Sequence, residues 1–446
     1  MAAIRGFCTG ALATSVRFRR SSRGARSPRR KRSNWASPTR CTRTTTWPLK
    51  RPRSPPGSPP VRRWPPPLRN GCSGRWTACP MPTPSGPRRP SRRPSPPPPT
   101  RARASRHSSR NANRTSQAPD MTLPAIFDTM RLPLIGAPMF ICSGPELVIA
   151  QCKAGIVGTF PALNAREKDG EPIQLEEWLT RIKTELAEYD AAHPDKPSAP
   201  FGVNLIAHRT NERLQRDVEI LMKHEVPIWI TSLGARPEIN EAAHSVGAVV
   251  LHDVINVKFA HKAIEKGADG LIAVAAGAGG HAGTWSPFAL VQEIREWFDG
   301  PLFLSGAQAT GDAVLAALAM GADGGYAGSM FIATEEANAP DGYKQMICDS
   351  GAEDILYTDH FTGVNGNYLI PSITAAGMDP AALGGEKGDV SKVAAGEKSK
   401  AWRDIWGAGQ GIGAIRDVPP AAQVVARLER EFAAAKARLD GLVKPA

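Results

Sequence analysis

The sequence predicts an α/β fold in which short buried strands alternate with longer amphipathic helices. From about residue 130, apolar runs of strand length recur eight times, and segments with apolar residues at helical spacing lie between them. Near-continuously apolar strands are typical of a parallel sheet covered by helices. The eight units span about 200 residues, near the usual size of an eightfold α/β barrel, so we predict a (β/α)8 TIM barrel.

The strand candidates share a short, mainly apolar sequence. They lie at 133–140, 155–161, 200–207, 227–234, 248–255, 269–276, 301–307 and 324–332. A doubly wound open sheet is the alternative arrangement. The number of strands favours the barrel, as does the absence of a G-x-G-x-x-G turn after the first strand.

Helix candidates fill the intervals between these strands. They lie at 145–155, 175–192, 211–225, 237–247, 259–268, 286–298 and 310–322. Several have apolar residues at positions i, i+3, i+4 and i+7, which predicts one buried face. Several also end at a glycine, as expected where the residue after a helix turns left-handed.

We predict a helical and loop-rich extension over 336–446 that follows the barrel at 121–335 and completes its active site. The stretch 360–373 places aromatic residues among turn residues and is predicted to form a lid. Tyr368 in that lid is a candidate ligand contact, and burial against the barrel is the alternative. The polar stretch 386–400 is predicted to be mobile. The amphipathic stretch 421–439 is predicted to be a final helix that packs on the barrel or on a partner subunit, which allows a homodimer.

Residues 1–120 differ sharply in composition from the rest of the chain. They hold 28 of the 56 Lys and Arg residues, 22 of the 41 prolines and one of the 42 acidic residues, Asp120. Like charges and proline prevent this segment from burying enough apolar surface to fold, so we predict disorder. Three interpretations stay open: a chain start assigned upstream of Met121, a basic tail, or a targeting segment. The basic tail would allow nucleic-acid binding, but we expect neither nucleic-acid nor membrane partners.

Composition also argues against a membrane-spanning protein and against a metal site. No stretch has the roughly 18 consecutive apolar residues of a membrane-spanning helix. Four of the seven cysteines lie in the first 120 residues, and Cys142, Cys152 and Cys348 have no metal-type spacing. An odd number of scattered cysteines fits a reduced cytoplasmic setting, and we expect no metal site.

The predicted strands end in unusually small residues. The most extreme case is GAGGHAG at 277–283, which carries one large side chain, that of His281. A catalytic barrel for phosphosugars would be expected to place Lys, Asp or Glu at these ends, and only Asp253 is available. Small residues instead suit a flat cofactor that lies against the backbone, with one acid–base group aimed at it.

The seventh and eighth units end in a pattern that predicts a phosphate site. Gly306 and Ala307 follow the seventh strand, just before a helix that begins near 310–312, and Gly328 and Ser329 follow the eighth. Loops after these two strands of a barrel commonly bind phosphate through backbone amides and a helix N-terminus.

In order along the chain, six elements resemble those of the nitronate monooxygenase family. This family of FMN-dependent barrel enzymes was formerly called the 2-nitropropane dioxygenases and includes the flavin-type enoyl-ACP reductases. The elements are GAPM at 136–139, FGVNL at 201–205, AGGHAG at 278–283, SGA at 305–307, AGSMFIATEEA at 327–337 and WGAGQGIG at 406–413. The resemblance covers most of the chain after Met121.

The resemblance implies an enzyme that holds FMN and places His281 over it as the catalytic residue. The implied FMN contacts are Ala137, Pro138, Met139, Asn204, Gly279, Gly280, Gly306, Ala307, Tyr326, Ala327, Gly328 and Ser329. Ala137, Pro138 and Met139 would line the ring, and the last six would surround the phosphate. Many relatives carry Gln and Glu where this chain has Val274 and Gly277.

The implied reaction is the oxidation of an alkyl nitronate, or of a nitroalkane, by oxygen to a carbonyl compound and nitrite. His281 would act as a base or stabilise the anionic nitronate. The alternative on the same fold is an FMN-dependent NAD(P)H reductase of an enoyl thioester or quinone. A non-flavin phosphate-ester lyase or isomerase is the alternative outside the flavin enzymes.

Overall fold

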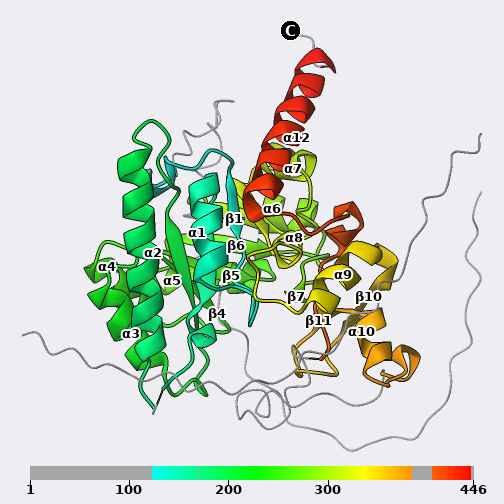
Figure 1. Ribbon diagram of the computed structural model, residues 1–446, viewed down its shortest axis with the longest axis horizontal. Helices are drawn as coiled ribbons and strands as arrows, with labels where there is room; N and C mark the ends of the chain where they lie inside the picture. Colours follow the sequence, from blue (N-terminus) through cyan, green and yellow to red (C-terminus); the bar gives the residue numbers. More distant parts are fainter. Residues whose placement is uncertain (1–122, 169, 384–403, 443–446) are drawn as a thin grey trace, which may run out of the picture. The chain divides into compact units, whose positions relative to one another are not determined.

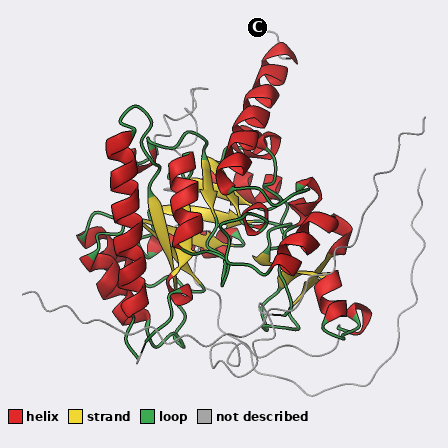
Figure 2. Ribbon diagram, in the orientation of Figure 1, coloured by secondary structure: helices red, strands yellow, loops and turns green. Residues whose placement is uncertain are grey.

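The structure is a computed structural model that describes residues 123–168, 170–383 and 404–442. The predicted disorder of 1–120 and the predicted mobility of 386–400 lie outside the described residues. In the remainder, strands form a central sheet and most helices lie outside it (Figure 2).

Eight parallel strands form the closed barrel that the sequence predicts. They are β1 (Leu134–Gly136), β2 (Gly158–Pro161), β3 (Phe201–Ile206), β4 (Ile228–Ser232), β5 (Val249–Val254), β6 (Gly270–Val274), β8 (Leu302–Ser305) and β9 (Gly324–Ala327). Their order in the sheet is β1-β9-β8-β6-β5-β4-β3-β2. A parallel bridge between Ile135 and Val157 joins β1 to the residue just before β2 and so closes the ring.

The predicted eighth strand, 324–332, is too long. Strand β9 ends at Ala327, and Ser329–Ile332 form the short helix α8. Met330, Phe331 and Ile332 are buried in the core beside the C-terminal segment. A short apolar run has no periodicity that separates a buried strand from a buried helix, which explains the error.

Seven helices follow the barrel strands at the predicted places. They are α1 (Pro145–Ala154), α2 (Ile173–Ala192), α3 (Leu214–Lys223), α4 (Pro237–Ser245), α5 (Val257–Glu265), α6 (Pro287–Arg295) and α7 (Gly311–Ala319). The first five lie on one side of the view in Figure 1. Helix α1 ends at Gly155 with φ of 94°, a left-handed conformation that confirms the predicted glycine end.

The barrel interior is filled by apolar side chains from alternate positions of each strand. Ile228, Ile230, Leu251, Ile272 and Phe303 form one buried cluster there. A larger cluster lies between the outer faces of the strands and the helices. Because side chains alternate along a strand, residues two beyond the interior set also face inward, at the carboxyl ends where barrel sites lie.

The C-terminal extension consists of α9 (Asp341–Asp349), β10 (Ile355–Thr358), β11 (Gly366–Leu369), α10 (Ile370–Ala375) and α12 (Ala421–Leu442). Strands β10 and β11 form an antiparallel hairpin, and β11 also pairs with β7, the two residues Gly280–His281. The extension elements α9, β10, β11 and α10 lie together opposite α2 to α4 in Figure 1. No described helix has the length and apolar character needed to cross a membrane.

The predicted final helix is present as α12, and it packs closely on α7. A methyl group on Gly311 would lie 2.3 Å from the carbonyl oxygen of Leu428, so only glycine fits at the start of α7. This close packing also brings the carboxylate of Glu431 to the backbone amide of Gly311, at 2.8 Å.

Candidate active site

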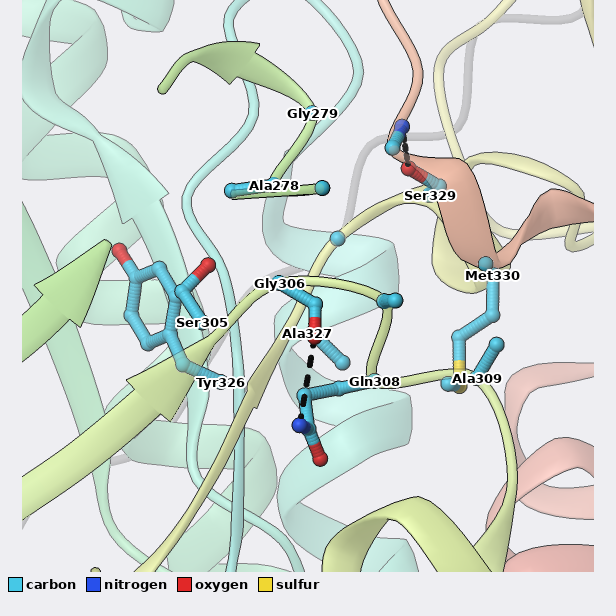
Figure 3. Close-up of a pocket in the computed structure, with 15 residues that line it drawn as sticks. Ala278, Gly279, Ser305, Gly306, Gln308, Ala309, Tyr326, Ala327, Ser329 and Met330 are labelled. Carbon is cyan, nitrogen blue, oxygen red and sulfur yellow. Dashed lines mark hydrogen bonds between the residues drawn. The ribbon is translucent and has the colours of Figure 1, made fainter. Parts of the chain in front are cut away.

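A pocket lies beyond the carboxyl ends of β6, β8 and β9 (Figure 3). Four segments line it: the loop after β6, the loop after β8, the turn from β9 into α8, and a segment of the extension. The lining residues are Gly277, Ala278, Gly279, Ser305, Gly306, Ala307, Gln308, Ala309, Tyr326, Ala327, Gly328, Ser329, Met330, Gly409 and Gly411. Most of them have no side chain or a small one, so the pocket wall is largely backbone.

Most of the predicted phosphate and loop residues meet in this pocket. Seven of the predicted contacts line it, namely Gly279, Gly306, Ala307, Tyr326, Ala327, Gly328 and Ser329. Ala137 and Met139 lie at its edge, because a methyl group on Gly328 would be 3.5 Å from Cβ of Ala137 and 3.4 Å from Sδ of Met139. Pro138 lies between them and is half-buried.

Besides Ala137, Pro138 and Met139, two more predicted contacts lie outside the pocket lining, and the predicted catalytic residue His281 does too. Asn204 is buried near the end of β3, inside the barrel. Gly280 is paired with Asn367 of β11. Asn204 lies in the FGVNL motif and Gly280 in the AGGHAG motif, but the sequence did not predict that Gly280 would pair in a sheet.

The loops of the pocket need small residues for steric reasons. A methyl group on Gly279 would lie 2.8 Å from the backbone nitrogen of Gly409, closer than carbon contacts normally come. Gly306 has φ of 131°, and the next residue, Ala307, has φ of 53°. Left-handed backbone at two successive positions turns the chain sharply after β8, and glycine adopts it without steric cost.

The extension supplies one wall of the pocket through Gly409 and Gly411, which were not among the predicted contacts. The backbone amide of Gln410 donates to the carbonyl oxygen of Gly277 at 2.9 Å. The amide of Gly409 donates to Oγ of Ser329 at 2.9 Å, the bond drawn at Ser329 in Figure 3. The WGAGQGIG motif was visible in the sequence, but its position depends on contacts with residues far away in the chain.

Backbone amides at the N-terminus of α7, the helix that follows the seventh barrel strand, already bond to side chains. Thr310 caps α7 through the amide of Ala313, and Glu431 of α12 accepts from the amide of Gly311. A carboxylate therefore already occupies the position that an anion would take. The sequence could not show this, because Glu431 lies 120 residues further along the chain.

His281 lies in β7, at the end of the side-chain-poor loop. Its Nε2 is 3.0 Å from Oγ1 of Thr362, whose hydroxyl donates to the carbonyl oxygen of Val364 at 2.9 Å. Since that hydroxyl has one proton, its oxygen receives the Nε2 proton of the neutral ring. Burial lowers the pKa of His281 to about 4, so the ring is neutral at neutral pH.

The β10–β11 hairpin holds the histidine loop in place. Nδ2 of Asn367 donates to the carbonyl oxygen of Ala278 at 2.6 Å, and the hydroxyl of Tyr357 donates to that of Ala282 at 2.9 Å. Tyr368 is fully buried and packs edge-on against Phe361. The 360–373 segment thus contacts the histidine loop, and Tyr368 takes the buried position that was the alternative to a ligand contact.

A second group of polar side chains lies at the ends of β3, β4 and β5. Nδ2 of Asn204 donates to Oγ of Ser232 at 2.7 Å, and Ser232 donates to Oδ2 of Asp253 at 2.5 Å. Burial raises the pKa of Asp253 to about 6. Burial and the charge of Asp253 raise the pKa of Tyr326, which lines the pocket, well above its usual value.

The other titratable groups have structural surroundings. His252 points away from the interior and lies 2.6 Å from the hydroxyl of Thr231, and burial lowers its pKa to about 4. Burial raises the pKa of Cys142 and Cys152 to about 12, which makes both poor nucleophiles. Among the described residues, no three His, Cys, Asp or Glu side chains gather in a way that would hold a metal ion.

Known proteins of similar sequence share the barrel region. A family model described as nitronate monooxygenase matches residues 125–431. A nitronate monooxygenase of Paraburkholderia phytofirmans is 25% identical over 345 residues, which are 67% of this chain and 92% of the relative. A nitronate monooxygenase of Neurospora crassa is 29% identical over 370 residues, 73% of this chain and 95% of the relative.

A third relative carries a different name. The (3aS,4S,5R,7aS)-5-hydroxy-7a-methyl-1-oxo-octahydro-1H-indene-4-carboxyl-CoA dehydrogenase of Rhodococcus jostii is 28% identical over 232 residues, which are 52% of this chain and 61% of the relative.

Solved structures show the same fold at lower identity. FabK from Thermotoga maritima has a TM-score of 0.58 at 22% identity and covers 72% of this chain and 100% of its own. The nitroalkane oxidase from Streptomyces ansochromogenes has a TM-score of 0.58 at 23% identity and covers 71% of this chain and 100% of its own.

Proposed function

Since the chain belongs to the nitronate monooxygenase family, a family of oxidoreductases, we propose that it oxidises alkyl nitronates with oxygen. The products are a carbonyl compound and nitrite, the cofactor is FMN, and His281 is the catalytic residue. The observation that carries the proposal is the loop 277–283: its first three residues line the backbone-walled pocket, and His281, two residues beyond them, is the one imidazole that the loop supplies.

The residues present fit FMN in two respects. The pocket wall is backbone at Gly279, Gly306 and Gly328, so a bulky planar ligand with a phosphate can approach the amides closely. A side chain at Gly279 would collide with Gly409 and would lie 3.1 Å from Oγ of Ser329, which explains the glycine independently of any ligand. Ser329 accepts from Gly409, so its own hydroxyl proton is available for a phosphate oxygen.

Asn204 would hydrogen-bond the FMN, and the other contact residues divide into groups. Gly306, Ala307, Gly328 and Ser329 would hold the phosphate, with Tyr326 and Ala327 beside it. Ala137, Pro138 and Met139 would line the ring at the pocket edge, and Gly279 and Gly280 would let it pass the histidine loop. Bound FMN would supply the electron acceptor for the oxidation.

His281 acts at the substrate. Its ring is neutral above pH about 4, so it can take a proton from the carbon next to a nitro group. An anionic nitronate beside the ring would offset the unfavourable burial of charge and raise the pKa of His281, which would let the imidazolium stabilise the anion. Thr362 keeps the ring oriented in both cases through its contact with Nε2.

A second candidate is the reduction of an enoyl thioester or a quinone by NAD(P)H on the same cofactor. The observation in its favour is the 28% identical relative from Rhodococcus jostii, whose name is that of a carboxyl-CoA dehydrogenase. The departures at Val274 and Gly277 also leave the substrate region unlike that of many family members.

The two candidates separate in one spectroscopic experiment. The purified chain is loaded with FMN, and its visible spectrum is followed without oxygen after addition of an alkyl nitronate or of NADPH. Bleaching by the nitronate but not by NADPH supports the proposed function. Bleaching by NADPH and indifference to the nitronate would move the chain to the reductase candidate, and a protein that takes up no FMN would overturn both.

A further inference from the structure

A row of three polar side chains crosses the inner face of the barrel mouth, and two of them, Ser232 and Asp253, have no part in the proposed reaction. Asn204, Ser232 and Asp253 lie near the carboxyl ends of the neighbouring strands β3, β4 and β5. Ser232 and Asp253 are two residues beyond Ile230 and Leu251 of the interior cluster, so their side chains point inward. Active sites of barrel enzymes lie at this end of the strands.

The hydrogen-bond directions in this row are fixed by proton counting. An ionised carboxylate can only accept, so Asp253 takes the one hydroxyl proton of Ser232. Oγ of Ser232 must then accept from Asn204, which excludes the amide carbonyl of Asn204 from that position. The second amide proton of Asn204 goes to the carbonyl oxygen of Ile230 at 3.1 Å.

Both donors of Asn204 are therefore used on the β4 side. Its carbonyl oxygen, Oδ1, is the remaining polar atom, and no described residue donates to it. Without Asp253, the hydroxyl of Ser232 would be free to donate to that carbonyl, and the amide group would turn by half a rotation. Its NH₂ group would then face the ligand in place of the carbonyl.

A purely structural role does not explain Asp253. Oδ1 of Asp253 is buried and has no hydrogen-bond partner among the described residues. Burying a carboxylate oxygen in this way is unfavourable, and a serine or asparagine at this position would avoid it. Asp253 pairs with Ile272 of β6, and the loop that follows β6 lines the pocket.

We propose that Asp253 is a positioning residue of the cofactor site, which acts through Ser232 to hold the carbonyl of Asn204 toward the ligand. The site then offers an acceptor and selects a ligand with an N–H donor at this point. The imide N–H of the flavin pyrimidine ring has that chemistry. The proposal rests on the proposed function, because it takes FMN as the ligand.

The test compares two probes on the full chain: FMN, and FMN methylated at the imide nitrogen, which lacks the donor. Dissociation constants are measured from flavin fluorescence with the wild-type chain and with three variants. We expect the wild type to bind FMN about tenfold or more tightly than the methylated analogue, as expected for one hydrogen bond. We expect Asp253→Val and Ser232→Ala to lose most of this preference.

Asp253→Asn provides the conservative rescue. Its carbonyl can still accept the proton of Ser232, so the variant is expected to keep the preference although it has lost the charge. Asp269→Val is the matched control. It removes a carboxylate that accepts from the amide of Val250, just before β6 and away from the mouth, and it is expected to lower stability without changing the preference.

The outcomes separate this proposal from the proposed function. If Asp253→Val and Ser232→Ala bind FMN and keep the wild-type preference, the proposal is overturned while the flavin assignment stands. A wild type that binds the methylated analogue as well as FMN overturns it too. If Asp253→Val does not fold, Ser232→Ala and the wild type still decide. A wild type that binds no FMN overturns the proposed function together with the proposal.

Discussion

The two halves of the barrel mouth are built differently. At the ends of β3, β4 and β5, polar side chains bond to one another across neighbouring strands, as Asn204, Ser232 and Asp253 do. At the ends of β6, β8 and β9, most lining residues are Gly, Ala or Ser, and the loops are held by contacts from the extension, as at Gly277 and Gly409. The β3–β5 half therefore presents side-chain donors and acceptors, and the β6–β9 half presents a wall that is largely backbone.

The two halves of the barrel mouth therefore suit different roles toward a ligand. Side chains on rigid strands can present a defined acceptor, because their rotamers are fixed by neighbours. Backbone loops can approach a bulky ligand closely, but they need external support to keep their shape. The extension gives that support, and its residue Thr362 also contacts Nε2 of His281.

The largest effect is expected for His281→Ala. Loss of the only imidazole in the pocket loop should lower turnover of a nitronate or nitroalkane by about 10²–10⁴-fold, the usual contribution of a positioned acid–base group. FMN binding should be retained, since the loop backbone is unchanged. Steady-state oxygen uptake and flavin content measure both, and full turnover with bound FMN would contradict the assignment.

A substitution at Gly279 is expected to disturb the β6–β9 half of the barrel mouth. The new methyl group in Gly279→Ala would lie 2.8 Å from the nitrogen of Gly409, so the extension must move away. We expect FMN affinity to fall by about tenfold or more, measured by fluorescence titration. Gly413→Ala is the control. Gly413 lies in the same extension motif as Gly409, and a methyl group there has no neighbour closer than 3.9 Å. Equal affinities for the two variants would show that the contact has no role.

A smaller effect is expected for Thr362→Val. Without the acceptor at Nε2, the ring of His281 loses its orientation, and turnover should fall by about tenfold, the equivalent of one hydrogen bond. Thr362→Ser keeps the hydroxyl and should stay close to the wild type. If valine and serine give the same turnover, Thr362 does not position the ring.

The pH dependence gives a further comparison. The pKa of His281 is lowered to about 4, so the neutral ring is lost only as pH falls through about 4, and kcat/KM for a nitroalkane should fall there. A group with a lowered histidine pKa binds fewer protons in the folded state, so its contribution to stability also decreases as pH falls from 6.5 toward 4. A kcat/KM profile that falls already at pH 6 to 7 would contradict this assignment.

The smallest effect is expected at the α7–α12 contact. Glu431→Ala removes the carboxylate from the amide of Gly311 and should lower the free energy of unfolding by about 1 kcal/mol, as for a lost helix cap. Urea denaturation measures it. Glu429→Ala, on the same helix, removes a more exposed acid whose contact with Arg131 is 4.0 Å long, and it should change stability less.

The sequence predicted the barrel because its strands are short and apolar and its helices are periodic, and these signals are local. It also brought Gly306, Ala307, Gly328 and Ser329 together correctly, since barrel topology places the ends of successive strands side by side. The end of β9 was wrong because a buried apolar run looks the same in strand and helix.

The features that the sequence missed depend on distant contacts. The pairing of His281 with Gly366, and its contact with Thr362, join residues about 80 positions apart and leave no local pattern. The hydrogen bonds that join Asn204, Ser232 and Asp253 could have been predicted from the sequence. Polar residues near the ends of three neighbouring apolar strands are expected to lie side by side. From the sequence, Asp253 was considered only as a single catalytic carboxylate, and its hydrogen-bond partners were not predicted.

The central claim is that this pocket carries out oxygen-dependent oxidation of a nitronate. The most direct measurement is nitrite release by the FMN-loaded full chain from an alkyl nitronate, with and without oxygen. We predict nitrite in proportion to the nitronate consumed, only when oxygen is present, and little from His281→Ala at equal flavin content. Flavin-loaded protein that consumes no nitronate and releases no nitrite in the presence of oxygen would contradict the account.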